Sequence, residues 1–341
     1  MNIDILTVEE LERFRQLIGT SDKIVLCCHR NPDGDAVGSM LGLSEYLHEC
    51  GKVPVVIVPD AYPDFLQWLP GTERMVRYDK HKSFADEILS QADLLFCLDF
   101  NTVSRTGDMV EAITNSKSAK VMIDHHLSPD MDTVLCISHP EACSTCELVF
   151  RLIWQLGGFD LMTRKCAVPL YCGMMTDTGG FTYNSTRPEI FFIISQLLTK
   201  RINKDKIYRN VYNNYSEWRV RLTGYVLYQK LVVLSDYKAS YFVLTRDDLK
   251  KFHYIKGDAE GLVNMPLQIK GSKLSISLRQ DTEKDNLVWV SLRSVDDFPC
   301  NKMAERYFNG GGHLNASGGR LECSVEEAEA VVRKAIEEFC G

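Results

Sequence analysis

Residues 24–36 read IVLCCHRNPDGDA. The first five residues are apolar, which is typical of a buried parallel strand, and a polar turn then leads into a helix that begins near Ala36. The same alternation recurs along the chain, with further apolar runs at 53–58, 94–98 and 120–123 and helical segments between them. Strands that alternate with helices predict an α/β fold built on an open parallel sheet.

The pattern changes beyond about residue 190. We expect a helix there, at 190–202, followed by a smaller α+β region rich in short alternating strands. Its predicted strands are 231–234, 241–244, 274–278 and 288–292, and its predicted helices are 302–308 and 325–339. The sequence therefore predicts a first domain at 1–190, a helical linker at 191–215 and a second domain at 216–341.

The bulk composition excludes several classes of protein. Apolar residues make up 45% of the chain and charged residues 25%, which is ordinary for a globular protein. No apolar run approaches the roughly 18 residues of a membrane span, and the acidic start of the chain does not resemble a signal peptide. The twelve cysteines lie mostly in apolar runs, as reduced thiols do. We therefore expect a cytoplasmic protein, and we interpret the pair Cys143 and Cys146 as a helix start rather than a zinc site.

The charge balance limits the possible partners. With 39 basic and 46 acidic residues, the formal net charge is −7. No global positive field is available to hold long nucleic acid, so a nucleotide-handling protein with this charge balance would have to bind phosphates locally. This favours small nucleotides or very short single strands of RNA or DNA over long duplexes or a membrane surface.

Acidic residues and histidines follow several of the predicted strands. HRNPDGDA at 29–36 follows the first strand, Asp99 follows the strand at 94–98, and DHH at 124–126 follows the strand at 120–123. A fourth cluster, GMMTDTGGF at 173–181, ends a helical segment. In an open α/β sheet the carboxyl ends of the strands form the ligand crevice. Mixed carboxylates and imidazoles suit manganese or a similar divalent cation, and two such ions can activate a water and stabilise charge on phosphorus.

Each of these residues also has an ordinary structural interpretation. A single Asp after a strand is more often a helix cap or a turn former than a ligand. Asp124 could orient His125 or cap the next turn, and Asn31 could form a turn or bond a leaving oxygen. Arg105 could brace a ligand or pair with Asp108. The joint occurrence of the clusters, in this order, nevertheless favours a metal site.

These four motifs resemble those of the DHH phosphoesterase superfamily. Near the other end of the chain, GGGH at 310–313 and ASGG at 316–319 resemble the superfamily's associated C-terminal domain. The resemblance covers nearly the whole chain and is closest to the branch of stand-alone nanoRNases and 3′-phosphoadenosine-5′-phosphate phosphatases. It implies a catalytic first domain, a substrate-binding second domain and an active-site cleft between them. It also implies two divalent metal ions, with manganese as the expected metal, Asp99 as the bridging ligand and a bridging hydroxide as the nucleophile. The implied ligands are His29, Asp33 and Asp99 for one metal and Asp35, Asp99, His125 and Asp177 for the other.

The resemblance also assigns catalytic and substrate-binding roles. His126 would face the substrate phosphate, and Asp33 would serve the chemistry beside it. In the second domain, the glycines would let backbone amides approach an anion, and His313 and Ser317 could donate hydrogen bonds to it. Arg293 ends a strand and could pair with phosphate in a bidentate manner. The substrate-binding group expected from the sequence is therefore Arg293, Gly311, Gly312, His313 and Ser317, although a glycine run by itself is also typical of a flexible loop.

The resemblance implies a manganese-dependent phosphoesterase that acts on short oligonucleotides, on 3′-phosphoadenosine-5′-phosphate, or on both. A cyclic or linear dinucleotide phosphodiesterase and a pyrophosphatase-like hydrolase are the alternatives among enzymes. The alternative outside enzymes is a nucleotide-binding regulatory module, which would be expected to lack some of the metal ligands. A homodimer is suggested by the family alone.

Overall fold

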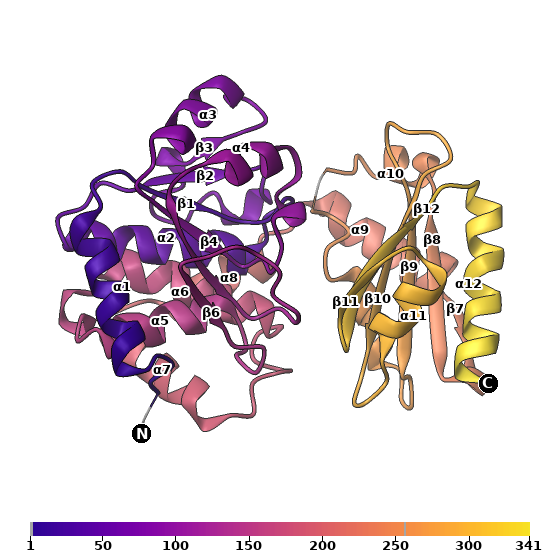
Figure 1. Cartoon of the computed structure of the whole chain (residues 1–341). Coiled ribbons are helices and arrows are strands. Elements are labelled where there is room, and N and C mark those ends of the chain that lie inside the picture. The colour runs from indigo at the N-terminus through magenta and orange to yellow at the C-terminus, as the bar shows by residue number, and fades with distance from the viewer. Residues whose placement is uncertain (1–2, 256) are drawn as a thin grey trace. The chain divides into compact units, whose positions relative to one another are not determined.

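The computed structural model divides into two compact units, Met1–Asn214 and Tyr215–Gly341 (Figure 1). It describes residues 3–255 and 257–341. Each unit has its own hydrophobic core and is described by itself. Within the described residues, the helices are too short or too polar to cross a bilayer. The twelve cysteines, all of them described, are free thiols.

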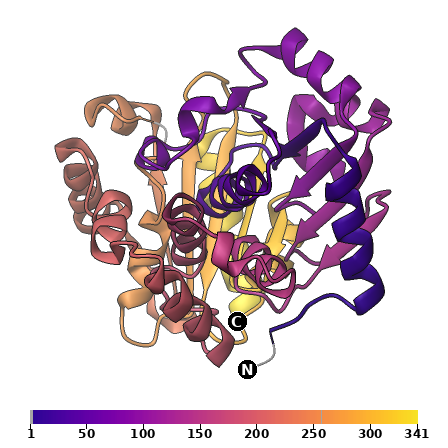
Figure 2. The ribbon, with the colours of Figure 1, turned by 90° about the vertical axis from the view of Figure 1, so that its left-hand side faces the viewer.

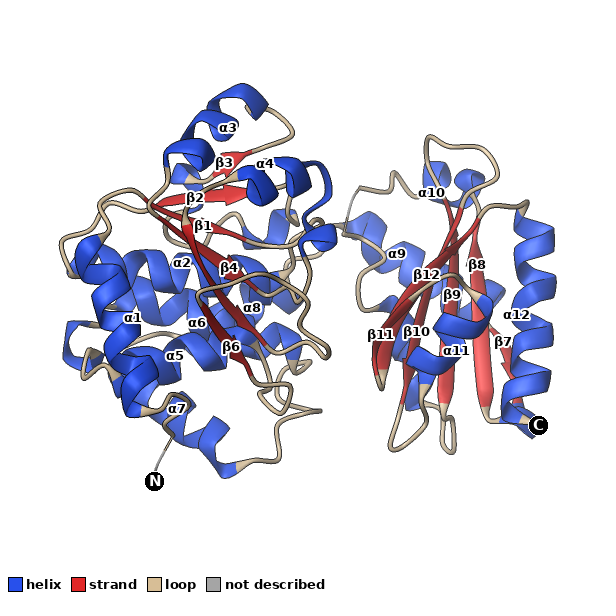
Figure 3. Cartoon of the chain, in the orientation of Figure 1, coloured by secondary structure: helices blue, strands red, loops and turns tan. Residues whose placement is uncertain are grey.

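The first unit is built on a parallel sheet. In spatial order its strands are β3-β2-β1-β4-β5-β6, and each neighbouring pair is parallel (Figure 3). This confirms the predicted open parallel sheet. The two strands that the sequence pattern did not predict lie at the edges: β3 has two residues, and in β6 buried and exposed residues alternate. The strands are β1 (Ile24–Cys27), β2 (Val55–Val58), β3 (Val76–Arg77), β4 (Leu94–Leu98), β5 (Ala119–Asp124) and β6 (Leu135–Ser138).

Helices cover both faces of this sheet, and successive strand residues point to opposite faces. Ile24 and Phe96 face one core, while Val25 and Cys97 face the other. The first face is covered by α1 (Val8–Thr20), α2 (Gly34–Glu49), α5 (Thr145–Gln155) and α6 (Arg164–Asp177), several of which Figure 2 shows end-on. The second face is covered by α3 (Lys82–Gln91) and α4 (Val110–Asn115).

The helices on the first face pack at unusually short range. A Cβ added to Gly173 of α6 would lie 2.2 Å from the sulfur of Cys146 on α5 and 3.0 Å from the carbonyl oxygen of Gly34 on α2. Only a glycine permits this approach. Cys146 therefore serves as a small buried packing residue in the first turn of α5, in line with its interpretation as part of a helix start.

The segment expected as a linker is largely part of the first unit. It forms α7 (Pro188–Thr199) and α8 (Lys204–Tyr212). Apolar residues of both helices, among them Leu197 and Val211, are buried in the core of the first unit. The division between the units falls after Asn214 because these helices bury their apolar faces against α6 and its neighbours.

The second unit is a mixed sheet with helices on both faces. Its strand order is β11-β12-β10-β9-β8-β7, with β8 and β9 parallel and the other pairs antiparallel. The strands are β7 (Val232–Leu234), β8 (Ala239–Leu244), β9 (Leu274–Gln280), β10 (Val288–Ser294), β11 (Gly311–His313) and β12 (Ala316–Leu321). The helices α11 (Cys300–Tyr307) and α12 (Val325–Cys340) pack on one face, and α9 (Glu217–Tyr225) and α10 (Arg246–Lys251) on the other.

Candidate functional site

The predicted ligands meet at the point where the strand order reverses, beside β1 and β4. His29 lies two residues beyond β1, Asp99 directly follows β4, and His125 directly follows β5. Helices supply the other predicted ligands, because Asp33 and Asp35 flank the first residue of α2 and Asp177 is the last residue of α6. The carboxyl ends of the parallel strands therefore bring the clusters together, as the topology of such sheets requires.

The first group consists of His29, Asp33 and Asp99. Its ligand atoms lie within 4.8 Å of one another. Nδ1 of His29 lies 2.8 Å from the carbonyl oxygen of Arg30, so Nε2 is directed inward, 3.3 Å from Oδ2 of Asp99 and 3.9 Å from Oδ2 of Asp33. Asp33 has two roles, because its Oδ1 accepts from the backbone amides of Asp35 and Ala36 and caps α2.

The second group consists of Asp35, His125 and Asp177. Nε2 of His125 lies 3.8 Å from Oδ2 of Asp35, 3.6 Å from Oδ2 of Asp177 and 3.6 Å from Oδ1 of Asp99. Asp99 therefore presents Oδ2 to the first group and Oδ1 to the second. Its backbone adopts a positive φ of 64°, a conformation that is uncommon outside glycine and often marks functional sites.

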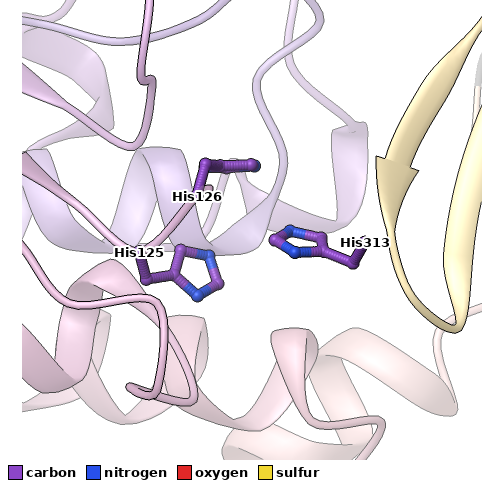
Figure 4. Close-up of side chains that lie close together, drawn as sticks. All are labelled: His125, His126 and His313. Atoms are coloured by element: carbon purple, nitrogen blue, oxygen red, sulfur yellow. The ribbon is translucent and has the colours of Figure 1, made fainter. Parts of the chain in front are cut away.

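His126 is oriented by Asp124. Its Nδ1 lies 2.7 Å from Oδ1 of Asp124, and its backbone amide donates to Oδ2 at 3.1 Å. Asp124 is completely buried, and the ring of His126 lies edge-on to that of His125, with 5.0 Å between centroids (Figure 4). The partner of Asp124 is thus His126 rather than His125, whose Nδ1 instead lies 3.3 Å from the carbonyl oxygen of Ala142.

The electrostatics of these groups suit a cation. Burial and the nearby carboxylates of Asp99 and Asp177 raise the pKa of Asp35 well above its usual range. Burial alone would lower the pKa of His29 and of His125, but the adjacent carboxylates outweigh it and raise each pKa to about 9. Carboxylates and imidazoles in two groups that share the buried carboxylate of Asp99 form a donor set that fits divalent metal ions.

The first turn of α5 contributes contacts that the sequence did not predict. The backbone amides of Thr145 and Cys146 donate to Oδ2 and Oδ1 of Asp35 at 2.6 and 2.9 Å. The hydroxyl of Thr145 donates to Oδ1 of Asp99 at 3.0 Å. A signal was present, because Ser144 and Glu147 have the spacing of a helix-start motif, but no local pattern indicates which distant carboxylates such a helix end will meet.

Asn31 and Arg105, the two further residues considered in the sequence, both form hydrogen bonds through their backbone in the described structure. Asn31 has a positive φ of 52°, and its amide donates to both carboxylate oxygens of Asp60 at 3.0 and 3.1 Å. The carbonyl oxygen of Arg105 accepts from the amide of Arg30 at 2.8 Å. These contacts fix the loop between β1 and α2 and support the turn-forming interpretation of Asn31.

In the second unit, Arg293 and His313 lie in one row across the sheet. Both stand directly opposite Ala316, Arg293 on β10 and His313 on β11. Directly opposite residues of antiparallel strands project from the same face. Arg293 is half-buried, and its Nη1 donates to the carbonyl oxygen of Leu292 at 2.9 Å. The fold therefore brings a guanidinium and an imidazole to the same face of the sheet.

Ser317 does not share that face. It stands opposite Leu292 and Gly312, one residue out of phase with Arg293. Its side chain is buried, and its hydroxyl donates to the sulfur of Cys300 in the core at 3.2 Å. The alternation of side chains along a strand explains this placement. As a correction to the expectation from the sequence, we omit Ser317 from the candidate anion-binding residues.

The glycine run is part of a strand pair rather than a flexible loop. A Cβ on Gly310 would lie 1.9 Å from the carbonyl oxygen of Gly318, and one on Gly312, whose φ is 142°, would lie 2.6 Å from that of Ala316. These two glycines are therefore required by the packing of the hairpin. A Cβ on Gly311 would meet nothing closer than 4.0 Å, so packing does not explain Gly311.

Comparison with known proteins identifies the family. The N-terminal domain of the DHH family matches residues 23–174, and the DHHA1 domain matches residues 236–341. A solved structure of an exopolyphosphatase-related protein from Bacteroides fragilis is 50% identical, with 98% of each chain covered and a TM-score of 0.93. The chain belongs to the DHH family. The DHH match lies within the first unit and the DHHA1 match within the second.

Two curated relatives in the DHH family carry the name bifunctional oligoribonuclease and PAP phosphatase NrnA. The protein from Thermus thermophilus is 28% identical over 321 residues, 92% of this chain and 89% of its own. The protein from Bacillus subtilis is 28% identical over 327 residues, 95% of this chain and 96% of its own. These relatives are phosphoester hydrolases, and this DHH protein is an enzyme of the same class.

Proposed function

We propose that this protein is a two-metal, manganese-dependent phosphoesterase. The observation that carries the proposal is the position of Asp99, whose two oxygens face two separate ligand groups. The proposed ligands are His29, Asp33 and Asp99 for one ion and Asp35, Asp99, His125 and Asp177 for the other. When bound, such ions lower the pKa of a water and stabilise the charge that develops on an attacked phosphate.

The residues around the proposed ligands hold and orient reacting groups. The carbonyl oxygens beside Nδ1 of His29 and of His125 fix the direction of each ring, as is common for metal-binding histidines. Asp124 similarly holds Nδ1 of His126, so we expect His126 to meet a substrate phosphate through Nε2 and to polarise it or handle a proton there. Asp33 fixes the start of α2 and presents its second oxygen to the first group.

We further propose that the substrates are short oligonucleotides, 3′-phosphoadenosine-5′-phosphate, or both. The net charge of −7 disfavours long nucleic acid, and the two NrnA relatives have names that state both activities. We assign phosphate binding to Arg293 and His313, which share one face of the second sheet, together with the backbone of Gly311 and its neighbour Gly312.

A substrate panel with added manganese tests the proposal. It contains a dinucleotide, a five-unit RNA, a twenty-unit single strand, 3′-phosphoadenosine-5′-phosphate, a cyclic dinucleotide, pyrophosphate and polyphosphate. We expect the fastest release of mononucleotide from the dinucleotide or of phosphate from the bisphosphate. Chelation should abolish turnover, and manganese should restore it.

Other results would change the assignment in defined ways. Fast cleavage of only the cyclic dinucleotide, pyrophosphate or polyphosphate would retain the metal centre and contradict the proposed substrates. Full activity in a chelator would contradict the metal centre itself. Binding of two metal ions without turnover of any substrate would favour a regulatory nucleotide-binding role.

A further inference from the structure

We propose that Thr145 is a positioning residue of the metal centre, and that its hydroxyl sets the orientation of the shared carboxylate of Asp99. The inference rests on the proposed two-metal function and extends it to a residue outside the ligand set. Thr145 is the first residue of α5, and its side chain is completely buried. We call it a positioning residue because its hydroxyl contacts a proposed ligand rather than the substrate.

The contact is specific to one oxygen of Asp99. The hydroxyl of Thr145 donates to Oδ1 at 3.0 Å, and Oδ1 is also the oxygen that lies 3.6 Å from Nε2 of His125. Oδ2, by contrast, lies 3.3 Å from Nε2 of His29. The terminal torsion of an aspartate is soft, so a fixed donor is needed to hold one oxygen toward each group. Thr145 supplies such a donor in a position that is itself buried.

The same turn of α5 also holds Asp35. The amides of Thr145 and Cys146 donate to its two oxygens, and the start of a helix favours negative charge. Asp35 and Asp99 belong to different elements, and they precede Thr145 in the chain by 110 and 46 residues. One turn of helix therefore fixes two of the proposed ligands relative to each other.

A buried ion network anchors this turn. Glu147 is fully buried, and its carboxylate accepts from the amide of Cys143 at 2.8 Å. Nη2 of Arg187 donates to both of its oxygens at 2.7 and 2.6 Å, and Nη1 of Arg151 donates to one of them at 3.2 Å. Arg187 directly precedes α7, at the end of the segment that follows Asp177. The network therefore links α5 to the segment that follows Asp177, which is a third proposed ligand. A rigid support of this kind is what precise ligand placement requires.

A purely structural role for Thr145 is the competing explanation. A buried threonine also contributes methyl packing, and its loss would lower stability without any effect on metal binding. The variants Thr145→Ala and Thr145→Ser separate the two roles. Both remove the same methyl group, and they differ in the hydroxyl alone.

The experiment is a manganese titration of the metal-free full chain and both variants by calorimetry, with the unfolding temperature of each recorded. We expect Thr145→Ser to bind manganese within about threefold of the wild type. We expect Thr145→Ala to bind about 10- to 100-fold more weakly, the range typical for loss of a group that orients a ligand. In activity assays, Thr145→Ala should need correspondingly more manganese for half-maximal rate, while its KM for substrate at saturating manganese stays unchanged.

The outcomes separate this inference from the function on which it rests. Wild-type affinity in Thr145→Ala, or equal weakening in both variants, would overturn the positioning role and leave packing as the explanation. A wild-type chain that binds no manganese would overturn the proposed function, and with it the positioning role. If both variants unfold at a similarly lowered temperature but only Thr145→Ala binds manganese more weakly, the result would support the hydroxyl as the group that determines manganese affinity.

Discussion

Asp35 in the first unit and Asp248 in the second are both buried carboxylates, but they have opposite surroundings. Asp248 lies 2.8 Å from Nζ of Lys230 and accepts from the hydroxyl of Tyr225 at 2.7 Å, and despite burial its pKa is lowered. Asp35 lies near the carboxylates of Asp99 and Asp177, and its pKa is raised. The carboxylate of Asp248 is paired with a lysine ammonium, whereas that of Asp35 lies among further carboxylates and an imidazole, a set of donors that suits an added metal cation.

The largest effect on catalysis should follow removal of the negative charge of Asp99, the carboxylate that both ligand groups share. Asp99→Asn suits this test because asparagine tolerates the positive φ of this position, whereas alanine would add backbone strain. We expect kcat to fall by at least about 1,000-fold, since both ligand groups lose a charged oxygen. Turnover measurements test the fall in kcat, and elemental analysis tests whether metal is still bound. Near-wild-type turnover with two bound manganese ions would contradict the assignment of Asp99.

The next largest effect should come from His126, which lies in the first unit but outside the proposed ligands. His126→Ala should slow kcat by about 100-fold, because a group that polarises phosphate or transfers a proton is lost. Bound manganese, measured by elemental analysis, should remain at the wild-type level. Loss of metal instead would mean that the roles of His125 and His126 are exchanged.

The glycines of the second unit test whether its motif serves the fold or the substrate. Gly310→Ala should destabilise this unit by about 2 kcal/mol or more, because the new Cβ would overlap the backbone of Gly318. Gly311→Ala is the matched control and should change stability by less than about 0.5 kcal/mol. Urea denaturation measures both. Equal losses would contradict the distinction drawn between the two glycines.

Acid should affect Asp248 in a defined direction. Its pKa is lowered below the ordinary value of 3.8, so its contribution to stability is present above that pH and is lost as pH falls through the folded-state pKa. Asp248→Asn should cost about 1–2 kcal/mol at neutral pH and should weaken the dependence of stability on pH below about 4. The exposed neighbour provides the control Asp247→Asn. Calorimetric unfolding from pH 3 to 7 measures how stability depends on pH in each variant. The same dependence in Asp248→Asn as in the wild type would contradict the role of this carboxylate.

The smallest effect should be on KM, and it should distinguish residues on the two faces of the second sheet. Arg293→Ala should raise KM about tenfold with little change in kcat, because a phosphate contact common to ground and transition states is lost. Ser317→Ala should leave KM unchanged, since the Ser317 hydroxyl bonds to Cys300 in the core. Steady-state kinetics on the preferred substrate measure both. A raised KM in Ser317→Ala alone would reverse the assignment of the faces.

The fold was predictable where burial was continuous along the sequence. The bounds expected for β4 agree with the structure, because five consecutive apolar residues are all buried. The glycine-rich strands β11 and β12 were missed, since glycines supply no apolar alternation. The helices α7 and α8 were predicted in part as a linker, because periodicity indicates an apolar face but not the partner against which that face packs.

The proposed ligand set was expected from the motifs, and the structure brings its members into two groups around Asp99. Thr145, Glu147 and Arg187 were not expected, because their importance depends on contacts with residues about 40 to 110 positions away. Ser317 was expected to bind an anion, but its side chain is buried in the core, since a motif gives the order of residues and not the register of the strand that carries them.

The sequence by itself determined the parallel α/β architecture, the inventory of carboxylates and histidines and their positions after strands and at helix ends. These follow from local patterns of apolar and polar residues, which act over a few positions of the chain. The tertiary structure alone decided which oxygen of Asp99 faces which imidazole, which histidine Asp124 orients and which face of the second sheet carries Arg293. These features depend on how α2, α5 and α6 pack and on strand register, and both are set by contacts between distant parts of the chain.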